Sequence, residues 1–234
     1  MIPVRYLRDI RFRGSRIRVL TNSGDANENY IKRVIVFLHG SGLTGFGMER
    51  WISSLVKTPH KMAILFPSAP MRHYALDGKK SSVWHQRTSL DIDSNFEDLE
   101  GIDEMCSGLE HMLKDIRDTG VTDVTLGGFS MGGHLALHAC YRHHLLFDKC
   151  ACLSGYAVNS SSIYSSVLGD KCIPLFMAHG VEDDIVPLSW AGMTKAKLTE
   201  CGVNIEYQTF KSLKHDINST ELFKLFEWLK NGKS

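Results

Sequence analysis

The chain has no long run of apolar residues, and this excludes a whole class of proteins. None of its hydrophobic segments approaches the roughly 20 residues that a membrane-spanning helix needs, so we expect no stable insertion into a membrane. The N-terminus also lacks the apolar core of a secretory signal. With 27 basic and 26 acidic residues, the formal net charge of +1 gives no field that would attract nucleic acid.

The six cysteines lack the paired spacing of a metal site or of a disulfide framework. Most of them lie in apolar stretches, and Cys150 and Cys152 alternate along an expected strand. Buried, reduced thiols of this kind are typical of a cytosolic protein. We therefore expect a cytoplasmic protein without structural disulfides.

Internal repeats, low-complexity tracts and linkers are also missing, and 234 residues suit a single domain over 1–234. The first 33 residues are nevertheless unusual, because arginines crowd their beginning and alternate with apolar residues. The arginines are Arg5, Arg8, Arg11, Arg13, Arg16 and Arg18. This pattern favours a basic N-terminal hairpin or extension, with a turn at Gly14-Ser15 and one face in solvent. An organellar presequence and a weak contact with an anionic membrane are the alternatives.

Short apolar runs recur along the rest of the chain and alternate with helical patterns. The runs are Val34–Leu38, Met62–Phe66, Val124–Leu126, Cys150–Leu153, Leu175–Ala178 and Ile205–Phe210. The helical patterns include 96–116, 188–201 and a last helix that Asn218 would cap. Strands that alternate with helices predict an α/β fold with a mostly parallel central sheet and helices on both faces.

A serine between glycines stands where one strand passes into a helix. Residues 121–126 read as a strand, 135–141 read as a helix, and Gly128-Phe129-Ser130-Met131-Gly132-Gly133 joins them. Glycines on both sides allow a sharp turn that lifts the hydroxyl of Ser130 clear of the backbone at a helix N-terminus. The sequence therefore predicts a nucleophile at Ser130.

Function in parallel sheets concentrates beyond the carboxyl ends of the strands, and three further segments stand there. His39-Gly40-Ser41-Gly42 exposes backbone amides, so those of Ser41 and of Met131 could hold an oxyanion. No lysine follows these glycines, which excludes a phosphate-binding loop.

Acidic residues and a histidine follow two later strands. Asp183 and Asp184 both stand where a carboxylate could orient a histidine, and the spacing does not choose between them. His215 follows the last strand, which gives the order serine, aspartate, histidine. His134 and His138 have a spacing that could hold a metal, but no third ligand is evident, so we expect no metal.

These segments resemble the acyl-protein thioesterase, lysophospholipase and carboxylesterase family of α/β hydrolases. The resemblance extends from about Val34 to Leu229 and also rests on Phe66-Pro67-Ser68-Ala69-Pro70 and Val83-Trp84. It implies a catalytic triad and an oxyanion hole, with no cofactor. The triad residues would be Ser130, Asp183 and His215, and the oxyanion amides those of Ser41 and Met131.

Two departures from the family bear on the substrate. Thioesterase members usually carry aspartate in place of Leu43 and glutamine in place of Met131, whereas this chain matches the lysophospholipase-like branch, which is associated with short acyl esters. We therefore expect a serine carboxylesterase for short acyl esters or thioesters, with Leu43 and Trp84 at the substrate. A depalmitoylating thioesterase acting on acylated proteins, or a lysophospholipase, is the first alternative. A non-catalytic binding module is the second.

Two loops complete the expectation. Residues 70–95 show little periodicity and would wall the acyl or leaving-group pocket, the alternative being an ordinary surface loop. Residues 157–173 are too few for a folded lid, so the site should be open.

Overall fold

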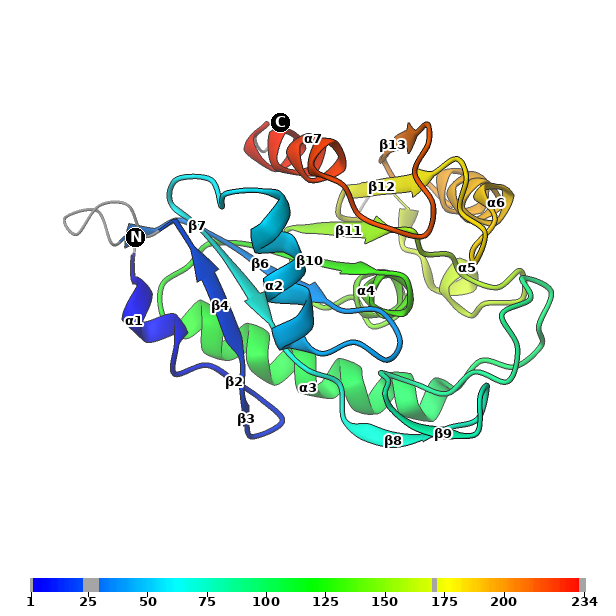
Figure 1. Cartoon of the computed structure of the whole chain (residues 1–234), viewed down its shortest axis with the longest axis horizontal. Coiled ribbons are helices and arrows are strands. Elements are labelled where there is room, and N and C mark those ends of the chain that lie inside the picture. The colour runs from blue at the N-terminus through cyan, green and yellow to red at the C-terminus, as the bar shows by residue number, and fades with distance from the viewer. Residues whose placement is uncertain (1, 23–29, 170–171, 232–234) are drawn as a thin grey trace.

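A seven-stranded sheet runs through the centre of the computed structural model, which describes residues 2–22, 30–169 and 172–231 (Figure 1). Its strand order is β13-β12-β11-β10-β6-β7-β4. The strands are β4 (Arg18–Thr21), β6 (Arg33–Leu38), β7 (Met62–Phe66), β10 (Asp123–Phe129), β11 (Lys149–Leu153), β12 (Leu175–Gly180) and β13 (Ile205–Phe210). All neighbours are parallel except β4, which pairs antiparallel with β7. The predicted α/β fold is confirmed.

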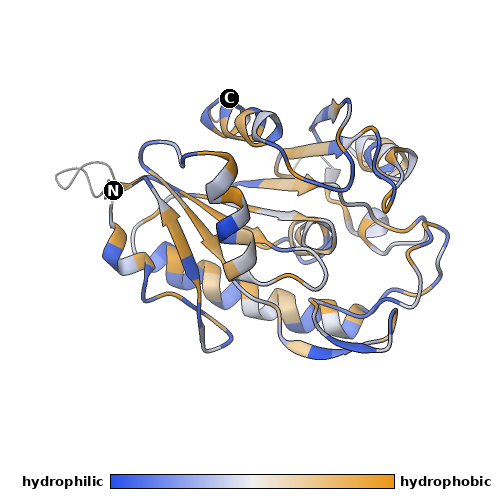
Figure 2. Cartoon of the chain, in the orientation of Figure 1, coloured by the Kyte–Doolittle hydropathy of each residue, from blue (hydrophilic) through white to orange (hydrophobic). Residues whose placement is uncertain are grey.

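Both faces of the sheet are buried, which explains why its inner strands are continuous apolar runs. In β6, Val34 and Leu38 belong to one core cluster, whereas Ile35 and Phe37 belong to the other. Successive side chains of a strand point to opposite faces, so a strand buried on both faces is mainly apolar. Figure 2 shows the hydrophobic colour concentrated on these central strands.

Five helices cover the two faces. Helices α3 (Leu99–Asp118), α4 (Met131–Tyr141) and α6 (Leu188–Glu200) pack on one face, and α2 (Gly45–Leu55) and α7 (Ser219–Lys230) pack on the other. Asn218 caps α7 as predicted, because its Oδ1 accepts from the amide of Glu221 at 2.9 Å. The predicted long helix begins at Leu99, where Asp98 provides the cap. All eleven residues of α4 are buried, so the helix that follows Ser130 is held rigidly in the core.

The N-terminal residues form a small hairpin before they reach the sheet. Strands β2 (Arg11–Phe12) and β3 (Ser15–Arg16) pair antiparallel, and the positive φ angles lie at Arg13 (50°) and Gly14 (78°). The turn is therefore centred one residue earlier than Gly14-Ser15. The chain then enters the main sheet as β4. Part of the segment 1–33, namely residues 1 and 23–29, lies outside the described residues.

Before this hairpin come β1 (Ile2–Pro3), which pairs with β5 (Tyr30–Ile31), and α1 (Val4–Leu7). All six cysteines are free thiols, and four of them are buried. Within the described part of the chain, no helix is long and apolar enough to cross a membrane.

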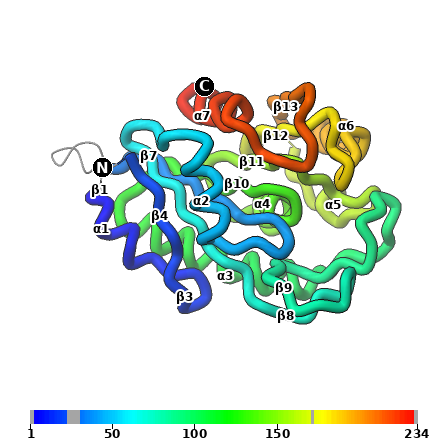
Figure 3. The backbone as a smooth tube through the Cα atoms, viewed as in Figure 1, coloured from blue at the N-terminus to red at the C-terminus, as the bar shows by residue number. Residues whose placement is uncertain are grey.

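Two segments border the carboxyl ends of the strands. Strands β8 (Met71–Tyr74) and β9 (Lys79–Ser82) form a hairpin, and the loop after it runs out to the neighbourhood of α5 (Ile163–Ser166) before it returns to α3 (Figure 3). Among residues 157–169 and 172–173, the four-residue α5 is the only α-helix, no strand occurs, and no lid domain is present there.

Candidate active site

Ser130 occupies a strained turn between β10 and α4. Its φ of 54° and ψ of −117° lie in a region that residues with a side chain rarely adopt. The turn closes only because its neighbours are glycines: a Cβ on Gly128 would lie 2.4 Å from the carbonyl carbon of Gly132, and one on Gly132 would lie 2.4 Å from the Leu38 oxygen. The predicted succession of strand, sharp turn and helix is confirmed.

Loops from two other strands bring a histidine and a carboxylate to this serine. His215, after β13, places its Nε2 3.0 Å from Ser130 Oγ. Its Nδ1 lies 2.8 Å from Oδ2 of Asp183, which follows β12. Since an ionised carboxylate only accepts hydrogen bonds, Nδ1 carries the proton and Nε2 is free to accept the proton of the serine hydroxyl.

Asp183 is buried and firmly held. Its Oδ1 accepts from the amides of Val186 at 2.8 Å and Ile185 at 3.0 Å, and its Oδ2 also lies 3.2 Å from Nε2 of His179. Burial alone would raise the pKa of this carboxyl group, but the hydrogen bonds from His179, His215 and the Val186 amide hold it well below its usual range. Asp183 is therefore ionised at neutral pH and can act as the counter-ion of a protonated His215.

The adjacent Asp184 has a different environment. Its carboxylate is exposed and forms a surface ion pair of 3.2 Å with Lys214. Consecutive side chains in this loop point in different directions, so only Asp183 reaches His215. The structure thus distinguishes the two aspartates that the sequence leaves open.

A cavity of about 230 Å³ opens beside Ser130. Of the residues singled out in the sequence, Ser41, Leu43, Met131 and His215 line it. Other lining residues come from the segment 70–95, which walls the cavity as the sequence indicates; these are Tyr74, Leu76, Arg87 and Leu90. Tyr156, from the loop after β11, also lines it and was not recognised in the sequence.

Trp84 is not among the residues that line this cavity, although the sequence suggested a contact with substrate. Its side chain is fully buried, and its Nε1 donates to the carbonyl of His39 at 2.8 Å. Its ring also lies 4.7 Å from the His39 ring. The large indole thus fills the core beneath the 39–45 loop, where it fixes the backbone that leads to Ser41.

His39 reinforces the same loop. Its Nε2 accepts from the amide of Ala69 at 3.0 Å, and its Nδ1 bonds the carbonyl of Gly40 at 2.8 Å. Burial lowers the pKa of His39 to about 4, although the Gly40 carbonyl opposes that shift. A neutral imidazole therefore bridges two loops at physiological pH.

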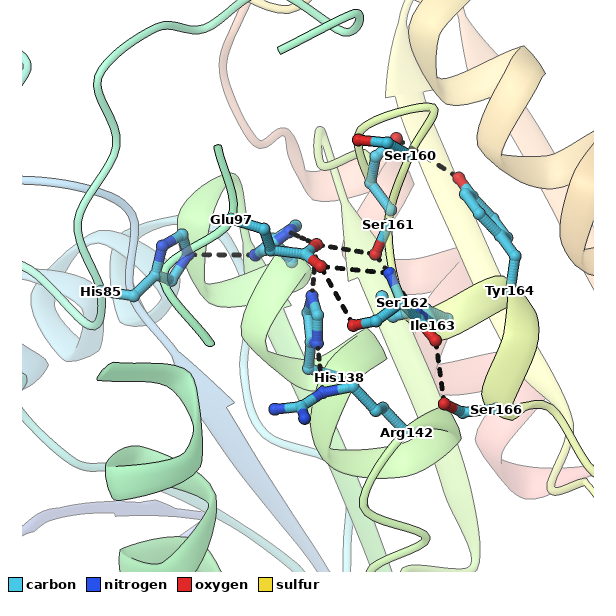
Figure 4. Close-up of polar contacts among 12 residues, drawn as sticks. His85, Glu97, His138, Arg142, Ser160, Ser161, Ser162, Ile163, Tyr164 and Ser166 are labelled. Atoms are coloured by element: carbon cyan, nitrogen blue, oxygen red, sulfur yellow. Dashed lines mark hydrogen bonds and ion pairs between the residues drawn. The ribbon is translucent and has the colours of Figure 1, made fainter. Parts of the chain in front are cut away.

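A second polar cluster lies behind the active-site helix. Glu97, His134 and His138 bring one candidate metal ligand each to within 4.8 Å of one another. Figure 4 shows Glu97 joined by dashed lines to His138, Ser161 and Ser162, and His85 lying beyond it. The sequence shows no third ligand for the two histidines, because Glu97 lies in the irregular segment before α3 and no local pattern connects it to them.

The hydrogen bonds show that this cluster is already satisfied without a cation. Arg142 Nε, which can only donate, bonds His138 Nδ1 at 3.0 Å. Burial lowers the pKa of His138 despite Glu97, so the ring is neutral and its proton is on Nε2, which donates to Glu97 Oε1 at 2.9 Å. That nitrogen has no lone pair to offer a metal. The absence of a metal site remains a prediction, and the cluster is best described as a hydrogen-bond network.

Replacing Glu97 with glutamine is expected to lower the free energy of unfolding by about 3 kcal/mol, because an amide cannot accept from His138, Ser161 and Ser162 at once. Urea unfolding at neutral pH measures the effect. Glu100→Gln is the matched control, since Glu100 is exposed in the first turn of α3 and should change the value by less than about 0.5 kcal/mol. Equal stability of the two variants would contradict a structural role for the network.

Comparison with known proteins shows the family to which the chain belongs. The phospholipase/carboxylesterase family profile matches residues 25–232. Lysophospholipase-like protein 1 of Mus musculus is 36% identical over 203 residues, which cover 83% of this chain and 84% of the mouse protein. Acyl-protein thioesterase 1 homolog 2 of Dictyostelium discoideum is 28% identical over 194 residues, covering 80% of this chain and 87% of its own length.

A solved structure supports the same fold. The crystal structure of Zea mays acyl-protein thioesterase 2 aligns with a TM-score of 0.79 and 24% identity, over 92% of this chain and 97% of the maize chain. The family match spans most of the chain, and esterase or thioesterase activity follows from it. The chain therefore belongs to the phospholipase/carboxylesterase family of α/β hydrolases and is a serine hydrolase.

Proposed function

We propose that the chain is a carboxylesterase that hydrolyses short acyl esters through Ser130, His215 and Asp183. One observation carries the proposal. Ser130 Oγ lies 3.0 Å from an imidazole nitrogen whose partner nitrogen lies 2.8 Å from a buried carboxylate, and the serine lines a cavity. This is the geometry that turns an unreactive hydroxyl into a nucleophile.

In the proposed reaction, His215 Nε2 takes the hydroxyl proton as Ser130 Oγ bonds to the carbonyl carbon. Asp183 stabilises the imidazolium. The amides of Ser41 and Met131 donate to the oxyanion, and Met131 is the first residue of α4, so the helix N-terminus adds to the positive potential there. The protonated histidine then gives its proton to the departing alcohol or thiol. Water activated by the same nitrogen cleaves the acyl-serine and releases the acid.

The size and lining of the cavity support a short acyl group. Its volume of about 230 Å³ lies below the roughly 300–1,000 Å³ typical of sites for drug-sized ligands. Leu43 and Met131 line it where thioesterase members usually carry polar residues. The proposed partners are accordingly small acyl esters or thioesters, which a single domain over residues 1–234 would process in the cytoplasm, where the free thiols stay reduced.

An acyl-protein thioesterase or lysophospholipase for long chains is the second candidate. Exposed apolar side chains favour it: Ile185 lines the cavity and is 51% exposed, so a longer chain could extend across it towards solvent. Relatives named as acyl-protein thioesterases point the same way.

A series of p-nitrophenyl esters separates the candidates. We expect kcat/KM to be highest for acetate or butyrate and at least about tenfold lower for dodecanoate and palmitate, because a longer chain overfills the cavity. Each ester is assayed below its critical micelle concentration. A value that rises steadily to palmitate would favour the long-chain alternative, and an absence of hydrolysis for every ester would contradict the proposed function.

A further inference from the structure

The cavity beside Ser130 contains one fixed positive charge and no negative charge. Arg87 lines it, although this side chain is only 8% exposed. None of the residues that line the cavity is an aspartate or a glutamate. Apart from Arg87, the surroundings are mainly leucines, aromatic rings and the catalytic groups.

The acidic residues nearest in sequence to Arg87 form other contacts. Asp91 Oδ1 accepts from the amide of Asp93 at 3.0 Å, and Asp93 Oδ1 accepts from Asn159 Nδ2 at 2.6 Å. Asp98 accepts from the amide of Gln86 at 2.6 Å and from that of Gly101 at 3.1 Å, where it caps α3. Glu97 belongs to the histidine network. Within residues 2–22, 30–169 and 172–231, no carboxylate oxygen lies within 4.0 Å of an Arg87 nitrogen, which is the limit for an ion pair.

The group that does contact Arg87 positions it without neutralising it. Nη1 donates to the hydroxyl of Tyr156 at 2.6 Å, and Cζ lies 4.8 Å from the centre of the same ring. The Tyr156 hydroxyl in turn donates to the carbonyl of Leu90. Burial raises the pKa of Tyr156, an effect that Arg87 opposes, so the phenol stays neutral. Tyr74, across the cavity lining, is also neutral for the same reason.

A buried guanidinium without a counter-ion is costly unless a ligand supplies the missing charge. It has five N–H donors in a planar fork, and among the described residues only Tyr156 accepts a hydrogen bond from them. The remaining donors suit the two oxygens of a carboxylate, or the oxygens of a phosphoryl group.

We propose that Arg87 binds an anionic group carried by the substrate, so that the preferred substrates are short esters whose acyl chain ends in a carboxylate or another small oxyanion. The inference rests on the proposed function, because the scissile carbonyl must lie at Ser130 while the anion lies at Arg87. Arg87 is then a specificity-determining residue that sorts esters by charge.

Three methyl esters of equal length test the proposal. They are the monomethyl ester of glutaric acid, the neutral ester in which an isopropyl group replaces the free carboxylate, and the ester in which a phosphonate replaces it. For the unmodified protein, we expect kcat/KM for the glutarate ester to exceed that of the neutral isostere at least tenfold, as about one charge-assisted pair provides. The phosphonate ester shows which oxyanion fits better.

Arg87→Met should lower the ratio of the two kcat/KM values by about tenfold to a hundredfold. Arg87→Lys, which keeps the charge but loses the fork, should give an intermediate ratio. Arg72→Met is the matched control on the neighbouring hairpin, since Arg72 does not line the cavity and pairs with Glu104 at 3.3 Å. It should leave the ratio unchanged.

Two results would overturn the proposal: an unmodified protein that prefers the neutral isostere or treats both esters alike, and an Arg87→Met variant that loses activity equally on both. The first can be read without any variant, so a failure of Arg87→Met to fold leaves the proposal testable. If the unmodified protein hydrolyses neither ester, the proposed function itself fails. Hydrolysis of both without preference removes only the role of Arg87.

Discussion

Replacing Ser130 with alanine is expected to lower kcat for p-nitrophenyl butyrate by about five orders of magnitude while the protein stays folded. The rate falls because the Ser130 hydroxyl, which bonds His215 Nε2, is the proposed nucleophile and alanine has no group to replace it. The fold should survive because the Ser130 side chain makes no capping bond to α4, and alanine places the same Cβ in the strained turn. Steady-state kinetics and far-ultraviolet circular dichroism measure the two effects.

A fluorophosphonate probe adds a direct readout of the nucleophile. The unmodified protein should be labelled at Ser130, and Ser130→Ala should not be labelled. Ser53→Ala is the matched control, because that hydroxyl bonds the Arg50 carbonyl within α2 at 3.0 Å and has no role at the cavity. Persistent labelling of Ser130→Ala would show that another residue is the nucleophile.

Much of the fold could be predicted because burial on both faces imposes a simple pattern. Strand β7, in which all five residues are buried, begins and ends where the apolar run does. Strand β13 also has its predicted bounds, although it is an edge strand without a fully buried residue. The sequence does not indicate that β4 belongs to the main sheet, because this four-residue edge strand has no fully buried residue and no clear alternation. Helix α2 was also missed: Gly45 and Gly47 are poor helix formers, and a cap from Thr44 together with packing of Met48 and Ile52 compensates for them.

In the candidate site, too, residues in consecutive elements could be recognised from the sequence, whereas contacts between distant residues could not. Ser130 could be recognised because its strand, turn and helix are consecutive. Arg87 and Tyr156 could not be paired, since 69 positions separate them and no periodic pattern joins two irregular loops. Trp84 lies in the irregular segment 70–95, and long irregular loops are often functional, which predicts a contact with substrate. In the structure the indole instead fills the core beneath the neighbouring loop.

Asp183 and Asp184 offer the sharpest test of the triad, because they are neighbours with the same chemistry and different surroundings. Asp183→Asn is expected to lower kcat by about four orders of magnitude. An asparagine can offer its amide protons to His215 Nδ1, which would favour the tautomer whose proton is on Nε2 and would leave Ser130 without a base. The imidazolium would also lose its buried counter-ion.

Asp184→Asn should change kcat by less than about threefold, since only a surface ion pair with Lys214 is lost. Both variants are assayed with p-nitrophenyl butyrate at neutral pH, and their folding is checked by circular dichroism. The two substitutions remove the same formal charge from adjacent positions, so the long-range potential changes almost equally in both. A large loss in Asp183→Asn alone can therefore be attributed to its 2.8 Å contact with His215, whereas equal losses would indicate that net charge in this loop, rather than the orientation of the imidazole, sustains catalysis.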